Sequence, residues 1–201
     1  MRTHARWWMM SSAVVALAVL LWASNSNLQA DDEAEMRAAV LKLASAIEKG
    51  DAAAVKKQSA DIAKKYEEVE DIMYIMALRR VTAAGKVTGG IGVGDKPGEI
   101  TPDGIERVII EFGKAAPNAQ DLAKNEQALL RAAYISAAIG EISKHQAPSK
   151  RKADWIKWSD EMAKESIALA EAIKKKDPGA VNKAAFKLDG TCAACHSVFR
   201  Q

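Results

Sequence analysis

The chain ends in a short motif whose side chains can hold a metal-bearing prosthetic group. Cys192 and Cys195 are three residues apart, and His196 directly follows the second cysteine. On a helix, this spacing presents two thiols that can form thioether bonds to the vinyl groups of a haem, while the imidazole ligates its iron. Both cysteines of the chain lie in the motif, so none remains for a structural disulfide. The motif therefore predicts one covalently bound haem c per chain, with His196 as the proximal iron ligand.

The same residues could instead form a thiol redox couple or half of a zinc site, or match the motif by chance. A thioredoxin-like couple belongs at a strand-to-helix turn in a βαβ unit, which the sequence does not indicate. A zinc site needs about four cysteine or histidine ligands, and the chain has three histidines, one of them His4 near its start. Haem attachment is the interpretation that these residues favour.

The first thirty residues read as a secretory signal. Arg2 and Arg6 form a basic start, residues 13–23 are apolar, and a polar stretch ends at Ala30. We expect cleavage after Ala30, although retention as a membrane anchor is an alternative because residues 7–10 lengthen the apolar run. Export agrees with haem attachment, which takes place outside the bacterial cytoplasm. The sequence thus predicts a periplasmic or otherwise exported protein that leaves the membrane after cleavage.

Residues 31–201 are expected to form a single haem-binding helical bundle with a crossover loop at residues 83–118. This length is sufficient for one domain with a hydrophobic core. The segment carries 27 Lys and Arg against 26 Asp and Glu, a net charge of +1, whereas the whole chain carries +3. This balance, together with the export signal, argues against a nucleic-acid partner.

The hydrophobic pattern is helical, and its most regular stretch leads into the motif. An a/d seam with alternating steps of four and three predicts that both cysteines face the interior of a bundle. Asp177 is placed to cap this helix, with Pro178 in its first turn. A preceding helix at residues 152–176 would form an antiparallel hairpin with it. The seam consists of Val181, Ala185, Leu188, Cys192, Cys195 and Phe199.

An earlier helical hairpin is similar in build but lacks the haem motif. Residues 43–51 parallel residues 169–177, and in this register Tyr66 and Val69 take the places of the two cysteines. The pattern predicts a helix that continues past Val69. Its seam is Val55, Ser59, Ile62, Tyr66, Val69, Met73 and Met76.

Between the hairpins, glycines interrupt the helical pattern. The Gly-rich segment, residues 89–98, predicts a flexible crossover and not a phosphate-binding loop, because no Gly-Lys-Ser/Thr follows it. A short helix should start near Ile105 and end at Gly113, followed by a long helix at residues 119–144. Arg79, Arg80 and the acidic residues just before them are interpreted as a solvated face. Those acidic residues are Glu67, Glu68, Glu70 and Asp71.

The last residues of the chain resemble those of the class II c-type cytochromes, which include cytochrome c prime and its low-spin relatives. In that family the haem motif lies in the last helix of an antiparallel four-helix bundle, and an aromatic and a basic residue follow it after two positions. Phe199 and Arg200 match those positions, which implies that they lie near the haem. The resemblance is strong over about the last fifty residues, looser over residues 32–80 and absent from the Gly-rich segment. It implies an all-α fold, an antiparallel four-helix bundle of the cytochrome c prime type, to which this sequence adds an extra short helix and a Gly-rich crossover loop.

The sixth position of the iron separates two functions that the resemblance implies. A methionine there would give a low-spin electron carrier, whereas an open position would bind nitric oxide or carbon monoxide. Met36, Met73 and Met76 are the candidate ligands, Met36 because the low-spin family members take theirs from the first helix. For each of them, core packing is the competing interpretation. His145, at a polar helix end, is expected to be solvated.

We expect an electron-transfer protein and not an enzyme, with a gas binder as the alternative. Its redox partner proteins are not revealed by the sequence. Family members often form dimers through their first two helices, which implies a possible homodimer.

Overall fold

The computed structural model describes residues 32–200, so the predicted signal at residues 1–30 lies outside the described part. The chain divides after Met36 into two compact units, and the arrangement given below is that of the second unit, from Arg37 onward. The described residues are mostly helical, which confirms an all-α protein, and their one sheet has two strands. After an opening helix at residues 32–48, the elements are α2 (Ala52–Lys65), α3 (Val69–Tyr74), β1 (Arg79–Val81), β2 (Val87–Gly89), α4 (Ile105–Lys114), α5 (Ala119–Lys124), α6 (Glu126–Ser143), η1 (Lys144–Gln146), α7 (Lys152–Lys174) and α8 (Pro178–Phe199).

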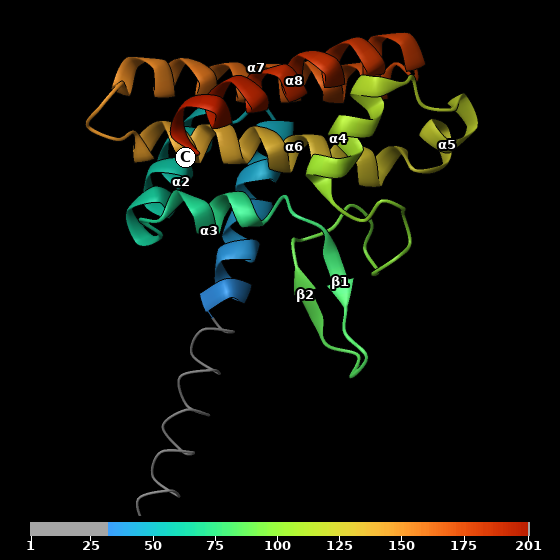
Figure 1. The fold of residues 1–201 in the computed structure, drawn as a ribbon, viewed down its shortest axis with the longest axis horizontal. Helices are drawn as coiled ribbons and strands as arrows, with labels where there is room; N and C mark the ends of the chain where they lie inside the picture. Colours follow the sequence, from blue (N-terminus) through green and yellow to red (C-terminus); the bar gives the residue numbers. More distant parts are fainter. Residues whose placement is uncertain (1–31, 201) are drawn as a thin grey trace, which may run out of the picture. The chain divides into compact units, whose positions relative to one another are not determined.

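Helix α6 is the central helix of the second unit, with α7 packed along it and α8 packed along α7 (Figure 1). Between Leu129 and Ser143, only Arg131 and Glu141 are not fully buried. The long helix expected at residues 119–144 has one apolar stripe in the sequence, which begins in α5 and continues along α6, and all its members are buried. The small residues on the other faces are buried as well, because a helix that is apolar all round is covered on every side. The stripe consists of Leu122, Leu129, Ala132, Ile135, Ile139 and Ile142.

Three contacts fix α7 against α6. A Cβ built on Gly140 would lie 2.8 Å from the backbone nitrogen of Ala163, so the two helices meet at van der Waals distance there. The hydroxyl of Ser166 donates to Ser136 over 2.8 Å. Near the start of α7, the indole nitrogen of Trp155 donates to the carbonyl of Ser143 at 2.6 Å. These contacts pack α7 along the second half of α6.

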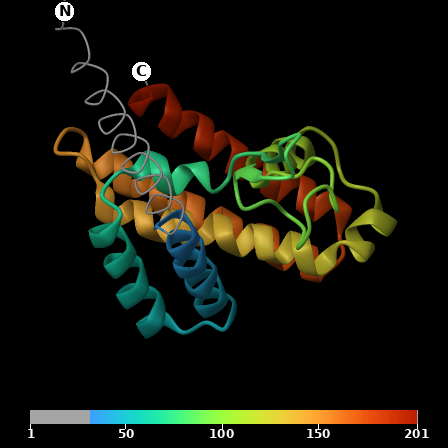
Figure 2. The same cartoon turned by 90° about the horizontal axis from the view of Figure 1, so that it is seen from below.

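The opening helix and α2 form a hairpin whose turn matches the turn between α7 and α8 (Figure 2). Gly50 and Lys176 both adopt positive φ angles, +70° and +53°. In each case the next residue, Asp51 or Asp177, caps the following helix by accepting hydrogen bonds from backbone N–H groups. The predicted cap at Asp177 and the similarity of the two hairpin turns are therefore confirmed.

The similarity ends where the motif begins in the second hairpin. Helix α2 stops at Lys65, and α3 starts at Val69, so the predicted continuous helix through Tyr66 is wrong. Acidic side chains destabilise the C-terminal end of a helix and stabilise its N-terminal turn. The break leaves two lysines in the last turn of α2 and places Glu70 and Asp71 in the first turn of α3.

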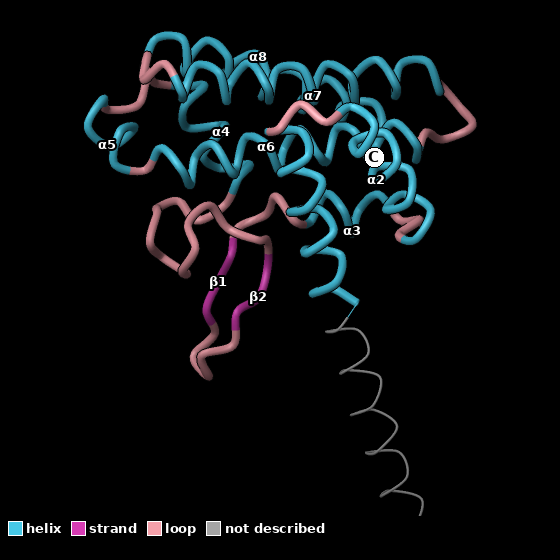
Figure 3. Tube along the Cα trace, turned by 180° about the vertical axis from the view of Figure 1, so that it is seen from behind, coloured by secondary structure: helices cyan, strands magenta, loops and turns pink. Residues whose placement is uncertain are grey.

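A β-hairpin that the sequence does not predict leads into the crossover. Strands β1 and β2 pair in antiparallel register, with Arg79 opposite Gly89, and they extend away from the helices (Figure 3). A Cβ on Gly89 would lie 2.0 Å from the carbonyl oxygen of Leu78. Only glycine fits at that position.

The Gly-rich segment is a folded loop held by a buried ion pair, and the prediction of a flexible crossover is corrected accordingly. The Nε of Arg79 lies 2.9 Å from the Asp103 carboxylate, and the two side chains are 7% and 9% exposed. Asp103 also accepts hydrogen bonds from the backbone nitrogens of Val93 and Gly98. The solvated face predicted for this region therefore does not include Arg79, whereas Arg80 is exposed.

Helix α4 follows this loop and packs against α8. The predicted short helix is confirmed, and it buries Ile105, Val108 and Ile109. A Cβ on Gly113 would lie 3.2 Å from the Cα of Phe186, so the end of α4 lies close to the α8 backbone. The next predicted helix, at residues 119–144, is instead divided at Asn125, which ends α5 and precedes α6.

Candidate haem site

Helix α8 carries the whole motif, and its two halves are covered differently. Asp177 accepts hydrogen bonds from the backbone nitrogens of Gly179 and Ala180, and Pro178 occupies the first turn. The fully buried residues of α8 all precede the motif. They are Val181, Ala184, Ala185 and Leu188. From Asp189 onward, every described residue of the helix is partly or fully exposed.

The two cysteines are half-buried and form no disulfide. The predicted seam is therefore confirmed up to Leu188, whereas Cys192 and Cys195, which were expected to face the interior of the bundle, are only partly buried. The first half of α8 is covered by α4 and α7, but these helices only partly cover the motif turns, that is, the helical turns that carry Cys192, Cys195 and His196. His196 is also partly exposed. The sulfur and imidazole groups therefore lie on a helix surface that the rest of the protein covers only in part.

Both thiols are held in their neutral form. Burial raises the pKa of the Cys192 thiol to about 12, and the negative charges of Asp189 and Glu106 add to this effect. Burial also raises the pKa of Cys195. A cysteine pair that exchanges disulfides needs a lowered thiol pKa, because the thiolate is the attacking species. These environments disfavour a thiol redox couple at the motif.

Phe199 anchors the end of α8 in an aromatic cluster. Its ring lies edge-on to Trp155, at 4.9 Å between centroids, and to Trp158, at 5.9 Å. Trp155 is buried and bonded to Ser143, whereas Trp158 is half-exposed. Arg200 is exposed, and its backbone nitrogen donates to the carbonyl of His196 at 3.0 Å. The two residues that the family resemblance placed near the haem thus lie at the exposed end of α8.

The three candidate methionines differ in position. Met36 is buried and belongs to the N-terminal unit. Met73 is half-exposed in α3, and Met76 is buried just after that helix. The carbonyl of Met76 accepts a hydrogen bond from the backbone nitrogen of Glu106, the same residue whose charge acts on the Cys192 thiol. Met76 is thus bonded to the start of α4, the helix that packs against α8.

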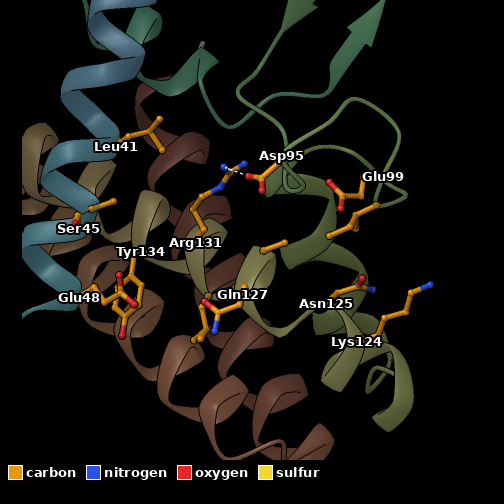
Figure 4. A pocket seen from close by; sticks show the side chains of 14 residues that line it. Leu41, Ser45, Glu48, Asp95, Glu99, Lys124, Asn125, Gln127, Arg131 and Tyr134 are labelled. Atoms are coloured by element: carbon orange, nitrogen blue, oxygen red, sulfur yellow. Dashed lines mark hydrogen bonds and ion pairs between the residues drawn. The ribbon is translucent and has the colours of Figure 1, made fainter.

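A cavity of about 440 Å³ lies beside the first half of α6, away from the motif (Figure 4). Glu48 comes from the opening helix, Glu99 from the Gly-rich region, and Tyr134 from α6. Arg131 and Asp95 form an ion pair across the upper part of the cavity at 2.7 Å. The described lining contains no cysteine, histidine or methionine. The cavity therefore offers none of the side chains that make up a c-type haem motif or a methionine sixth ligand.

His145, the other histidine of the described residues, is exposed and lies 3.2 Å from the Oγ of Ser59. The prediction of a solvated histidine is confirmed. Within residues 32–200, no group of three or more His, Cys, Asp or Glu side chains could bind a metal ion together.

The donor groups of the motif turns fit a haem. Two neutral thiols are spaced by one turn of helix, the imidazole follows directly, and the surface that carries them is only partly covered. Thiol addition to a vinyl group consumes the S–H hydrogen, so it requires thiols that are free of a disulfide. An apolar ring placed here would cover the half-buried thiol surface and contact the aromatic cluster around Phe199.

Two features near the motif were not found by sequence reasoning. One is the hydrogen bond from Trp155 to Ser143, and the other is the position of Arg151 over the Trp158 ring, at 5.9 Å from its centroid. The periodicity of residues 152–176 predicts that both tryptophans lie in the core, but only Trp155 is buried, and no local pattern shows that Trp158 remains half-exposed.

No known family, curated protein or solved structure matches this chain. Within residues 32–200, none of the helices has the length and apolar character required to cross a lipid bilayer.

Proposed function

We propose that this chain is an exported mono-haem c-type cytochrome that carries electrons. The observation that carries the proposal is the partial exposure of the helical turns that hold the motif, together with the free thiols of its two cysteines. Cys192, Cys195 and His196 lie on the C-terminal stretch of α8, from Asp189 onward, which its neighbours cover only in part, and both sulfurs are free thiols. When bound, the haem supplies a reversible one-electron couple.

The chain contributes attachment, ligation and partial exclusion of water. Each cysteine adds its sulfur to one vinyl carbon and its hydrogen to the other, which forms a thioether without any oxidant or reductant. The Nε2 of His196 would hold the iron from the proximal side. The Phe199 ring, packed on Trp155 and Trp158, shields one end of the site from water.

We also infer that the fold is an enlarged version of the class II cytochrome bundle. The support is the position of the motif in the last helix and the succession of α6, α7 and α8, which short turns connect and which pack in order. The opening helix and α2 would complete the bundle. The segment at residues 83–118 would then be an insertion.

The first experiment tests covalent attachment. The chain is produced in a host that matures c-type cytochromes, and haem is extracted with acidic acetone from the wild type and from the Cys192→Ala, Cys195→Ala double variant. We expect wild-type haem to stay with the protein and the variant's haem, if any, to be extracted. The Thr191→Ala, Ser197→Ala double variant is the matched control, since it changes two positions that flank the thiols. Extraction of the wild-type haem would refute the proposal.

An absorption spectrum of the reduced protein then separates the carrier from a gas binder. We expect sharp low-spin bands that carbon monoxide does not change. A broad high-spin spectrum that shifts with carbon monoxide would instead establish a five-coordinate, gas-binding haem. Met36→Leu, Met73→Leu and Met76→Leu variants identify the sixth ligand, because only the ligating residue should convert the spectrum to high spin when it is replaced.

A further inference from the structure

The turn between η1 and α7 carries three consecutive cations. Lys150, Arg151 and Lys152, here called the basic turn, are all exposed. Arg151 donates to the carboxylate of Asp154 at 2.8 Å, with both side chains about half in solvent. Charges at such positions interact weakly with each other but contribute to the field that an approaching molecule meets.

Described contacts connect the basic turn with the motif end of α8. The guanidinium of Arg151 lies 5.9 Å from the centre of the Trp158 ring. Trp158 in turn contacts Phe199, which follows Cys195 by one helical turn. The half-exposed Trp158 and Phe199 side chains thus lie between the cations and the haem attachment site.

This positive charge is local and does not follow from the overall composition. Residues 31–201 carry almost equal numbers of acidic and basic residues. On the side where α7 begins and α8 ends, however, the basic turn and the exposed Arg200 supply four cations, and Asp154 is bonded to Arg151. A half-exposed aromatic edge beside a cluster of like charges is typical of a transient protein-binding surface.

An acidic segment approaches the same end from the other side. Gln146 in η1 donates to the carbonyl of Tyr66 at 2.7 Å, and four exposed acidic residues follow Tyr66. No described aromatic contact joins this segment to α8. The basic turn would attract a negatively charged partner and the acidic segment a positively charged one, so an experiment can distinguish the two surfaces. The acidic residues are Glu67, Glu68, Glu70 and Asp71.

We propose that the basic turn and the Trp158 edge form the docking surface for an electron-transfer protein with an acidic surface. This inference rests on the proposed function, because the docked partner would exchange electrons with the haem held at the motif. Complementary charge would speed the encounter and orient the partner, and the aromatic edge would supply the apolar contact.

Helix α7 supplies an internal control for the test. A second run of three exposed cations, Lys174, Lys175 and Lys176, lies at its other end. Since α7 has 23 residues, the two runs are about 34 Å apart at a rise of 1.5 Å per residue. Changing either run to glutamine removes three positive charges, but only the first run adjoins the motif.

The first measurement is the binding of poly-L-glutamate, followed by tryptophan fluorescence at an ionic strength of about 10 mM, where screening is weak. It requires no haem, so its outcome is independent of the proposed function. We expect the Lys150→Gln, Arg151→Gln, Lys152→Gln variant to bind at least about tenfold more weakly than the wild type. The Lys174→Gln, Lys175→Gln, Lys176→Gln control should change the affinity less than about twofold. Equal losses in the two variants would overturn the proposal.

The second measurement is the oxidation of the reduced haem by ferricyanide and by tris(phenanthroline)cobalt(III), which carry opposite charges. At low ionic strength, the basic-turn variant should react about tenfold more slowly with ferricyanide and faster with the cobalt complex, and the control variant should match the wild type. If the wild type instead reacts faster with the cobalt complex than with ferricyanide, and neutral replacements in the acidic segment slow that reaction, the acidic segment and not the basic turn controls access to the haem, and the proposal is overturned. A chain without covalent haem would refute the proposed function alone, because polyglutamate binding would still report on the docking surface.

Discussion

Replacement of Arg79 by alanine should destabilise the protein strongly, because it would leave a carboxylate buried without its counter-charge. In addition to binding both carboxylate oxygens of Asp103, Arg79 donates to the carbonyls of Gly94 and Lys96 at 2.7 and 2.8 Å. With both side chains less than a tenth exposed, water cannot readily replace these bonds. Removal of one member of such a pair typically costs about 3–5 kcal/mol.

We expect the lower end of that range, about 3 kcal/mol, because Asp103 keeps its hydrogen bonds from the backbone of Val93 and Gly98. For a domain of this size, that loss corresponds to a decrease in Tm of about 6–12 °C. The free energy of unfolding is measured by urea denaturation followed by far-UV circular dichroism. Replacing Asp103 by asparagine in the Arg79→Ala background should recover part of the loss, since no unpaired charge then remains.

Arg80→Ala is the matched control. It removes the same side chain one residue along β1, where the arginine is exposed, and should change the stability by less than about 0.5 kcal/mol. If Arg79→Ala shifts the urea midpoint no more than Arg80→Ala does, the ion pair does not hold the loop, and the reasoning is wrong.

Three further predictions concern single positions. Burial raises the pKa of Asp103, but the hydrogen bonds and charge of Arg79 and the two backbone donors outweigh it, so the folded-state pKa lies below its usual value. The stability that results from this lowered pKa is present above about pH 4 and is lost as the pH falls through the folded-state pKa. Acid titration should therefore destabilise the wild type more than the Asp103→Asn variant. Gly92→Ala should lower the free energy of unfolding, measured by thermal denaturation, by at least about 2 kcal/mol, because its Cβ would lie 2.2 Å from the Nε of Arg79. Gly85→Ala, which has the same φ of +77° and open space around it, should lower it by about 1 kcal/mol. Equal losses in the two variants would show that the loop relaxes around the methyl group. With a pKa of about 12, Cys192 in the folded, haem-free chain should react with iodoacetamide at pH 8 roughly a thousandfold more slowly than in the chain unfolded in urea. Peptide mass spectrometry measures the two rates. Similar rates would contradict the effect of burial on this thiol.

Features that depend on neighbours in the sequence could be predicted. The cap at Asp177, the proline after it and the apolar steps through Leu188 all act within a few turns of one helix, and the structure has each of them. The motif was recognised for the same reason, since its spacing is local. What the spacing did not reveal is how much of Cys192 and Cys195 the other helices cover, which depends on where α4 and α7 lie.

Features that depend on distant partners were missed. Arg79 and Asp103 are separated by 24 positions, and nothing in either local sequence shows that they meet. A glycine-rich stretch reads as flexible when only its own residues are considered, although Gly89 is required by the nearby carbonyl of Leu78. The end of α2 at Lys65 had a local signal, the change from lysines to acidic residues, but the apolar steps through Tyr66 concealed it.

The uneven cover of α8 has a consequence for the order of assembly. The half that ends at Leu188 is packed between neighbouring helices, whereas every described residue from Asp189 onward keeps some exposure to solvent. Segments with few buried contacts open locally at a low cost in free energy, without unfolding of the rest. The last turns of α8 can therefore open while the core around α6 stays folded. Under the proposed function, haem could then be attached to both sulfurs of an already folded chain.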